Sequence, residues 1–66
     1  MKERRTISQR LYSIKDAGTY LGRSEWSMRR LIWAGSLPTV RIGGRIHLDK
    51  EDMDRLIEQH KENEQN

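Results

Sequence analysis

Residues 17–30 read AGTYLGRSEWSMRR and predict two short helices joined by a very tight turn. Gly22 is expected to end the first helix, because glycine tolerates the left-handed conformation of a helix C-terminus. Ser24 follows as the N-cap of the second helix. A connection this short forces the helices to cross steeply, and close crossing requires small residues where the backbones meet. Gly18 is expected to meet that need, although it costs a helix interior about 0.5–1 kcal/mol relative to alanine.

The helical periodicity extends on both sides of this turn. Ser13 provides a capping-box-like start for the first helix, and Gly35 followed by Pro38 prevents the second from continuing beyond about residue 34. Each helix has an inward apolar face, formed by Ile14, Ala17 and Leu21 in the first and by Met28, Leu31 and Ile32 in the second.

Residues 39–48 predict a β-hairpin, since two short alternating segments flank Gly43-Gly44, a two-residue hairpin turn. Val40 and Ile42 are expected to point inward with Ile46 and Leu48, which leaves Arg41 and Arg45 toward solvent. Asp49 then caps a third helix, with Asp52 at the capping-box position.

The order helix, tight turn, helix, hairpin, helix predicts a mainly α fold with a small β-hairpin, a winged helix-turn-helix. Residues 11–60 are expected to form this domain, between a flexible basic arm at 1–10 and a flexible polar tail at 61–66. The expected core is thin and consists of Tyr12, Ile14, Ala17, Leu21, Met28, Leu31, Ile32, Leu37, Val40, Ile42, Ile46, Leu48, Met53, Leu56 and Ile57.

Charge is divided unevenly along the 66 residues, whose net charge is +3. Residues 1–48 carry ten basic and three acidic side chains, whereas residues 49–66 carry three basic and seven acidic ones. This asymmetry predicts that the first part faces a polyanion and that the acidic segment is kept away from it.

The outer face and N-terminal end of the second helix are the expected reading surface, because an α-helix fits the major groove of B-DNA. Arg29 or Arg30 is suited to bind a guanine with two hydrogen bonds, and Ser27 to reach a phosphate or a base. Trp26 and Trp33 lie seven residues apart on one face, where they either shield the core or make contacts of their own. The expected DNA-binding residues of this helix are Ser24, Glu25, Trp26, Ser27, Arg29 and Arg30.

The hairpin tip is the second expected contact, because two arginines flank a glycine turn that lets the backbone approach a phosphate or a minor groove. Its expected DNA-binding residues are Arg41, Gly43, Gly44 and Arg45. Further contacts are expected from the arm and the turn, at Arg4, Arg5, Arg10 and Arg23.

Several classes of function have no support in the sequence. The chain has no cysteine, and His47 and His60 have no metal-site spacing. It has no nucleophile with a nearby base, no phosphate-binding glycine loop and no apolar run that approaches a membrane span. We therefore expect a soluble cytoplasmic protein that is not an enzyme and uses no metal or cofactor.

Residues 11–58 resemble the excisionase family, small winged helix-turn-helix proteins akin to the DNA-binding head of MerR-type regulators. The stretches that carry the resemblance are LYSIKDA (11–17), LGRS (21–24), MRRLI (28–32), GSLP (35–38), VRIGGR (40–45) and 52–57. The resemblance implies that the second helix enters the major groove and the wing the adjacent minor groove. Two positions depart from the family: Arg23 replaces an apolar residue, and Trp26 replaces a small or polar one.

The resemblance implies several roles. One is a recombination directionality factor, which binds tandem sites, bends DNA and assists a tyrosine recombinase. The domain fills nearly the whole chain without a coiled coil, which favours this role, and the acidic segment 49–66 would then face the recombinase or a second copy. The alternatives are a small MerR-like transcriptional regulator and a terminase-type DNA-binding subunit. From a different class, a protein-interaction or antitoxin-like adaptor would use Trp26 and Trp33.

Overall fold

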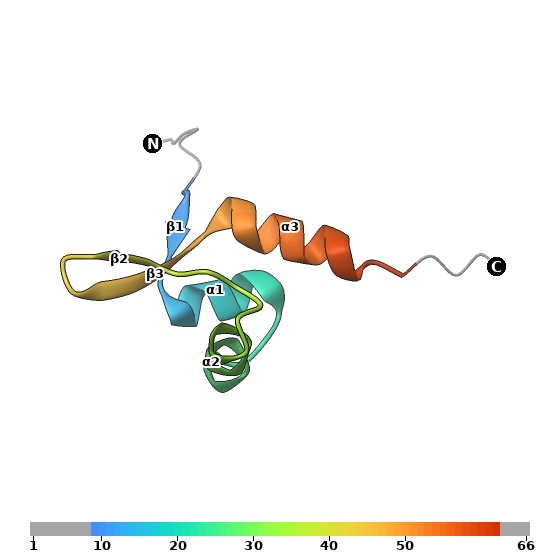
Figure 1. Cartoon of the computed structure of the whole chain (residues 1–66), viewed down its shortest axis with the longest axis horizontal. Helices are drawn as coiled ribbons and strands as arrows, with labels where there is room; N and C mark the ends of the chain where they lie inside the picture. Colours follow the sequence, from blue (N-terminus) through green and yellow to red (C-terminus); the bar gives the residue numbers. More distant parts are fainter. Residues whose placement is uncertain (1–8, 63–66) are drawn as a thin grey trace, which may run out of the picture.

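A computed structural model describes residues 9–62 and shows a winged helix-turn-helix (Figure 1). The helices α1 and α2 cross below a small sheet, and α3 runs away from the hairpin toward the C-terminus. The elements in chain order are β1 (Leu11–Tyr12), α1 (Ile14–Leu21), α2 (Glu25–Trp33), β2 (Val40–Ile42), β3 (Arg45–Asp49) and α3 (Lys50–His60).

The helices α1 and α2 begin at the expected N-caps. The Ser13 hydroxyl accepts a hydrogen bond from Asp16 N, and that of Ser24 accepts one from Ser27 N, each at 3.1 Å. The chain then closes on Gly18, whose carbonyl accepts from Arg23 N at 2.7 Å. A Cβ at Gly18 would lie 2.6 Å from the Arg23 carbonyl oxygen, so only glycine fits without a shift of the backbone. The close approach predicted at Gly18 is confirmed.

The sheet has three antiparallel strands in the order β1-β3-β2, one more than the sequence predicts. The additional strand is β1, in which Leu11 pairs with Asp49 and Tyr12 with Leu48. Two residues are too few to show an alternating pattern, which is why the sequence does not reveal this strand. It ties the start of the domain to the strand that leads into α3.

The β2–β3 hairpin, hereafter the wing, corrects one prediction about the core. Its two-residue turn pairs Ile42 with Arg45 and Arg41 with Ile46. Directly opposed residues of antiparallel strands share one face of the sheet, and faces alternate along each strand. Ile42 and Val40, which is paired with His47, therefore share the face of Arg45, not that of Ile46 and Leu48. The expected inward face of Val40 with Ile46 and Leu48 is thus also wrong, and the Ile42 side chain is 56% exposed. The prediction that Ile42 points into the core is wrong, and Arg41 lies on the face of Ile46.

The core is thin and lies between α1, α2, β3 and α3. Among the described residues, its buried members all belong to the predicted set. Besides Ile42, three other predicted members are not part of it, namely Ile57, at 38% exposed, and the half-buried Val40 and Ile46. Tyr12, Ile14, Leu21, Leu31, Ile32 and Leu56 pack around it half-buried. The buried members are Ala17, Met28, Leu37, Leu48 and Met53.

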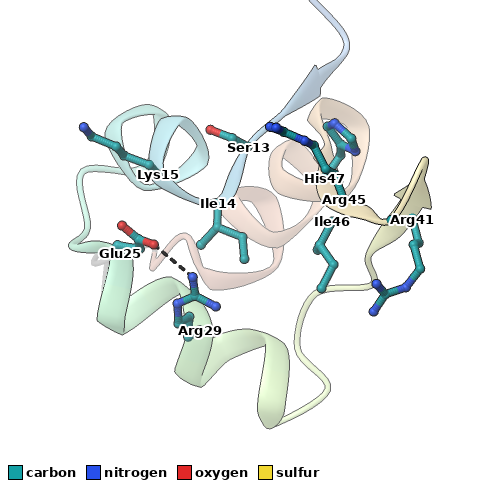
Figure 2. A pocket seen from close by; sticks show the side chains of 10 residues that line it. Ser13, Ile14, Lys15, Glu25, Arg29, Arg41, Arg45, Ile46 and His47 are labelled. Atoms are coloured by element: carbon teal, nitrogen blue, oxygen red, sulfur yellow. Dashed lines mark hydrogen bonds and ion pairs between the residues drawn. The ribbon is translucent and has the colours of Figure 1, made fainter.

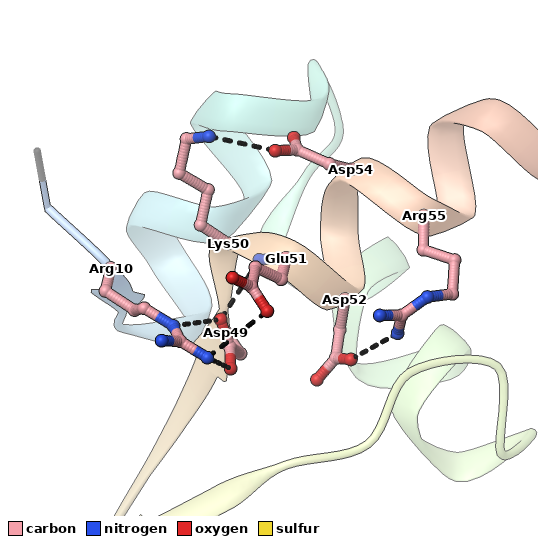
Figure 3. A network of polar contacts seen from close by, with 7 residues as sticks. All are labelled: Arg10, Asp49, Lys50, Glu51, Asp52, Asp54 and Arg55. Atoms are coloured by element: carbon pink, nitrogen blue, oxygen red, sulfur yellow. Dashed lines mark hydrogen bonds and ion pairs between the residues drawn. The ribbon is translucent and has the colours of Figure 1, made fainter.

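Polar contacts fasten α3 to the rest of the domain (Figure 3). Arg10 donates to both carboxylate oxygens of Asp49 at 3.0 Å and to Glu51 at 3.3 Å, while its carbonyl accepts from Lys50 N. Asp49 also caps α3, since it accepts from Glu51 N. On the other side, Asp54 accepts from Tyr20 of α1 and from Lys50.

The pairing of Asp49 predicts a pH dependence of stability. Its pKa lies below the ordinary value of 3.8, first because of the hydrogen bond from Arg10 and then because of that from Glu51 N. A carboxylate with a lowered folded-state pKa stabilises the fold above its unfolded pKa, and that contribution is lost as the pH falls through the folded-state pKa. Asn caps helices about as well as Asp but cannot ionise. Asp49→Asn should therefore unfold at lower urea than the parent at pH 7, and the gap should narrow below pH 3.8. A gap that stays constant with pH would contradict this assignment.

Candidate nucleic-acid interface

The outward face of α2 lies opposite Met28, which is fully buried. Residues advance about 100° around a helix, so the outermost positions are Trp26, Arg30 and Trp33. Arg30 is exposed, and no ion pair joins it to another residue within 9–62. It is therefore a cation free to meet a partner on this face.

The other polar side chains of α2 are already engaged with one another. Arg29 donates to the Glu25 carboxylate at 3.0 Å, one turn away on the same helix. Arg23, in the turn, donates its Nε hydrogen to the Ser27 hydroxyl at 2.6 Å. The corner at Arg23 is exposed, and the bond from Arg23 orients the Ser27 hydroxyl.

Trp26 and Trp33 do not shield the core. Their side chains are 60% and 66% exposed. The rings contact each other instead, with centroids 5.3 Å apart and planes at 81°. Of the two interpretations that the sequence leaves open, core shielding is excluded, and the aromatic pair is part of the outward face of α2.

An open groove of about 400 Å³ separates α2 from the wing (Figure 2). Ile14 and Ile46 lie between Arg29 on α2 and Arg41 on β2 and give the groove an apolar middle. Basic side chains predominate along its walls, and Glu25 is the one carboxylate among its lining residues. The basic lining residues are Lys15, Arg29, Arg41, Arg45 and His47.

Three polar lining residues of the groove are not among the DNA-binding residues predicted from the sequence. Ser13 and Lys15 stand at the N-terminal end of α1, and His47 on β3. The Nδ1 atom of His47 is buried and has no hydrogen-bond partner among the described residues. Their place in the groove has no local signal, because only the folded chain brings α1 beside the wing.

The tip of the wing carries Arg41 and Arg45 on opposite faces of the hairpin, as the pairing of Ile42 with Arg45 requires. Both side chains are exposed and line the groove. Gly43 and Gly44 have φ of 59° and 78°, the left-handed values that a tight hairpin turn of this kind demands. The turn thus lets two arginines project on either side of a narrow tip.

The expected arm contacts have different outcomes. Arg4 and Arg5 lie outside the described residues. Arg10 is bound to Asp49 and Glu51 in the fold, and those contacts raise its pKa above the ordinary value. Its guanidinium is therefore committed to α3 rather than presented beside α2 or the wing.

Within residues 9–62, none of the helices is both long and apolar enough to cross a bilayer. In the same range, no cluster of three or more His, Asp or Glu side chains is arranged to hold a metal ion.

Comparison with known families agrees with this geometry. The family described as helix-turn-helix domain matches residues 11–61, most of the chain. No curated protein and no solved structure matches this chain significantly. The matched range begins at β1 and extends past the end of α3, so it includes the helix pair, the groove and the wing. The chain belongs to the helix-turn-helix family of DNA-binding domains.

Proposed function

We propose that this domain binds specific sequences in double-stranded DNA, with α2 in the major groove and the wing in the adjacent minor groove. The observation that carries the proposal is the groove between them, which is open and lined by four Lys and Arg side chains against one carboxylate. The sugar-phosphate strand that separates a major from a minor groove would lie along it. Lys15, Arg41 and Arg45 then neutralise phosphates, because each carries a charge near this path.

The dimensions of α2 fit this arrangement. A helix with its side chains is about 10–12 Å across, and the major groove is about 12 Å wide. The N-terminal turn of α2 enters first, as in other helix-turn-helix proteins. Arg30, which has no ion pair among the described residues, is then free to reach a base edge.

An NMR titration with duplex DNA tests the binding surface. The amide resonances of residues 24–30 and 41–45 should shift, and those of residues 51–58 on α3 should move little. A protein-interaction module that uses only its tryptophans would leave both sets unmoved when DNA is added. That result would overturn the proposal.

Arg45→Ala should reduce the salt dependence of DNA binding. Each phosphate neutralised contributes about −0.9 to the slope of log K against log salt. The slope should therefore become shallower by about 1 when one phosphate contact is lost. Fluorescence anisotropy at several salt concentrations measures it.

The matched control for this variant is Arg55→Ala on α3. Arg55 is also an exposed arginine and pairs with Asp52, away from the groove. Its removal should leave the slope unchanged. An unchanged slope for Arg45→Ala as well would contradict the proposed contact between the wing and DNA.

As the biological role, we propose a recombination directionality factor that binds tandem sites, bends DNA and assists a tyrosine recombinase. The resemblance of residues 11–58 to excisionases supports this role. The position of α3 supports it as well, because α3 points away from the wing (Figure 1). Its carboxylates Glu51 and Glu58 are exposed and paired at the surface with Arg10 and Lys61, from which a basic partner would have to draw them. Such a surface suits a basic patch on the recombinase or on the next copy.

Binding to one site and to two adjacent sites distinguishes this role from the alternatives. A directionality factor should bind tandem sites cooperatively, bend the duplex, and promote excision by a tyrosine recombinase. Binding without cooperativity or bending, at a site that overlaps a promoter, would identify a transcriptional regulator. The excision role would then be wrong, although DNA binding would stand.

A further inference from the structure

The exposed aromatic pair on α2, Trp26 and Trp33, does not contribute to the core of the fold. Trp26 and Trp33 leave 60% and 66% of their side chains exposed, and neither belongs to the core. Exposure of two large aromatic side chains side by side marks a contact surface more often than an accident of sequence. The surface requires a partner that is apolar at its centre and compatible with the cations around it.

The position of the pair identifies that partner. About 100° of rotation per residue places Trp26 and Trp33 between Arg29 and Arg30 on the outward face of α2. If α2 lies in the major groove, as proposed above, the rings face the base edges and the arginines stand on either side. Positive charge around an apolar centre complements DNA, whose phosphates flank the groove. The major groove of DNA also presents one apolar group, the C5-methyl of thymine.

We infer that Trp26 reads the methyl group of a thymine and that Trp33 holds the Trp26 ring in place. Trp26 is in the first turn of α2, the end that reaches base edges. Trp33 is in the last turn, about 10 Å further along the helix axis. Its ring stands at 81° to that of Trp26 with centroids 5.3 Å apart, so it restricts the rotation of the Trp26 side chain. Trp33 is thus a positioning residue, and the pair determines sequence preference.

The test replaces thymine by uracil, which differs only by the lack of that methyl group. A binding site is first selected from a pool of random duplexes with the full chain. Each thymine of that site is then changed to deoxyuridine in turn, and affinity is measured by fluorescence anisotropy. At one or two positions the parent should bind the uracil duplex about fourfold more weakly, the effect of one lost methyl contact.

Variants on the same helix face assign the effect to the tryptophans. Trp26→Ala should bind the thymine and uracil duplexes equally at those positions, and Trp33→Ala should show a smaller difference than the parent. Arg30→Ala is the matched control, since it should bind both duplexes more weakly but keep their ratio. Trp26→Phe, which retains an apolar ring, should restore part of the discrimination.

The outcomes separate this inference from the proposed function. Equal affinity of the parent for thymine and uracil at every position of a selected site would overturn the reading of a methyl group and leave DNA binding intact. Discrimination that survives in Trp26→Ala would overturn the role of Trp26. Discrimination unchanged in Trp33→Ala would overturn its positioning role. Failure to bind any duplex would instead contradict the proposed function itself.

Discussion

Gly18→Ala should lower the free energy of unfolding by about 1–3 kcal/mol, the usual effect of forcing extra volume into a closely packed site. The added Cβ would lie 2.6 Å from the Arg23 carbonyl oxygen, which is backbone and cannot turn aside. It would also lie 3.2 Å from Met28 Cγ in the core. A chain of this length has a stability of about 3–10 kcal/mol, so the loss is a large fraction of the total.

Urea unfolding followed by circular dichroism measures this change. Thr19→Ala is the control, because Thr19 is the exposed neighbour on the same helix and its replacement should change stability by no more than about 0.5 kcal/mol. Alanine has the higher helix propensity, by about 0.5–1 kcal/mol, so without the clash Gly18→Ala would stabilise α1. A variant as stable as the parent would therefore show that α1 and α2 do not approach so closely in solution.

The helix pair could be predicted from sequence because its signals are local. They are a cap at Ser13, a glycine at Gly22 and a second cap at Ser24, all within twelve residues. Each acts through hydrogen bonds to its own neighbours, and the structure has both serine caps as expected. The angle between the helices follows from the brevity of the turn, so it needs no knowledge of distant contacts.

The strands depend on distant partners, so the local sequence predicts them less completely than it predicts the helices. β1 exists only because Leu11 and Tyr12 pair with Asp49 and Leu48, across the whole helix pair. Arg10, assigned from sequence to the DNA-contacting arm, is held by Asp49 and Glu51 for the same reason. A basic residue near the N-terminus gives no local indication that its partners are 39 and 41 positions away.

The wrong prediction for Ile42 has a different origin, since the sequence contains the information that decides its face. A two-residue turn opposes residue 42 to residue 45, and opposed residues share a face. Ile42 and Arg45 could therefore never have pointed in opposite directions. Hydrophobicity alone suggested a core position, but the register of the hairpin decides the face. This register places Arg41 and Arg45 on opposite faces of the hairpin, and both side chains line the groove beside α2.

Arg30→Ala should weaken binding to a selected DNA site by about 1–3 kcal/mol, or about fivefold to a little over a hundredfold. Arg30 is exposed on the outward face of α2 and has no ion pair within the described residues, so its guanidinium can form two hydrogen bonds to a guanine. Arg29 is a weaker candidate, because Glu25 already accepts from it at 3.0 Å. Alanine favours helices, and α2 should remain folded by circular dichroism.

Arg30→Lys distinguishes the reading of a base from simple attraction to phosphate. Lysine retains the positive charge but lacks the planar fork of donors. If Arg30 reads a base, Arg30→Lys should lose most of the preference for the selected site over random duplex while keeping the parent's salt dependence. If lysine instead restores full affinity and preference, Arg30 contacts a phosphate. The sequence preference of α2 must then come from other residues on the same face, among which Trp26 is the nearest to the N-terminal end that enters the groove first.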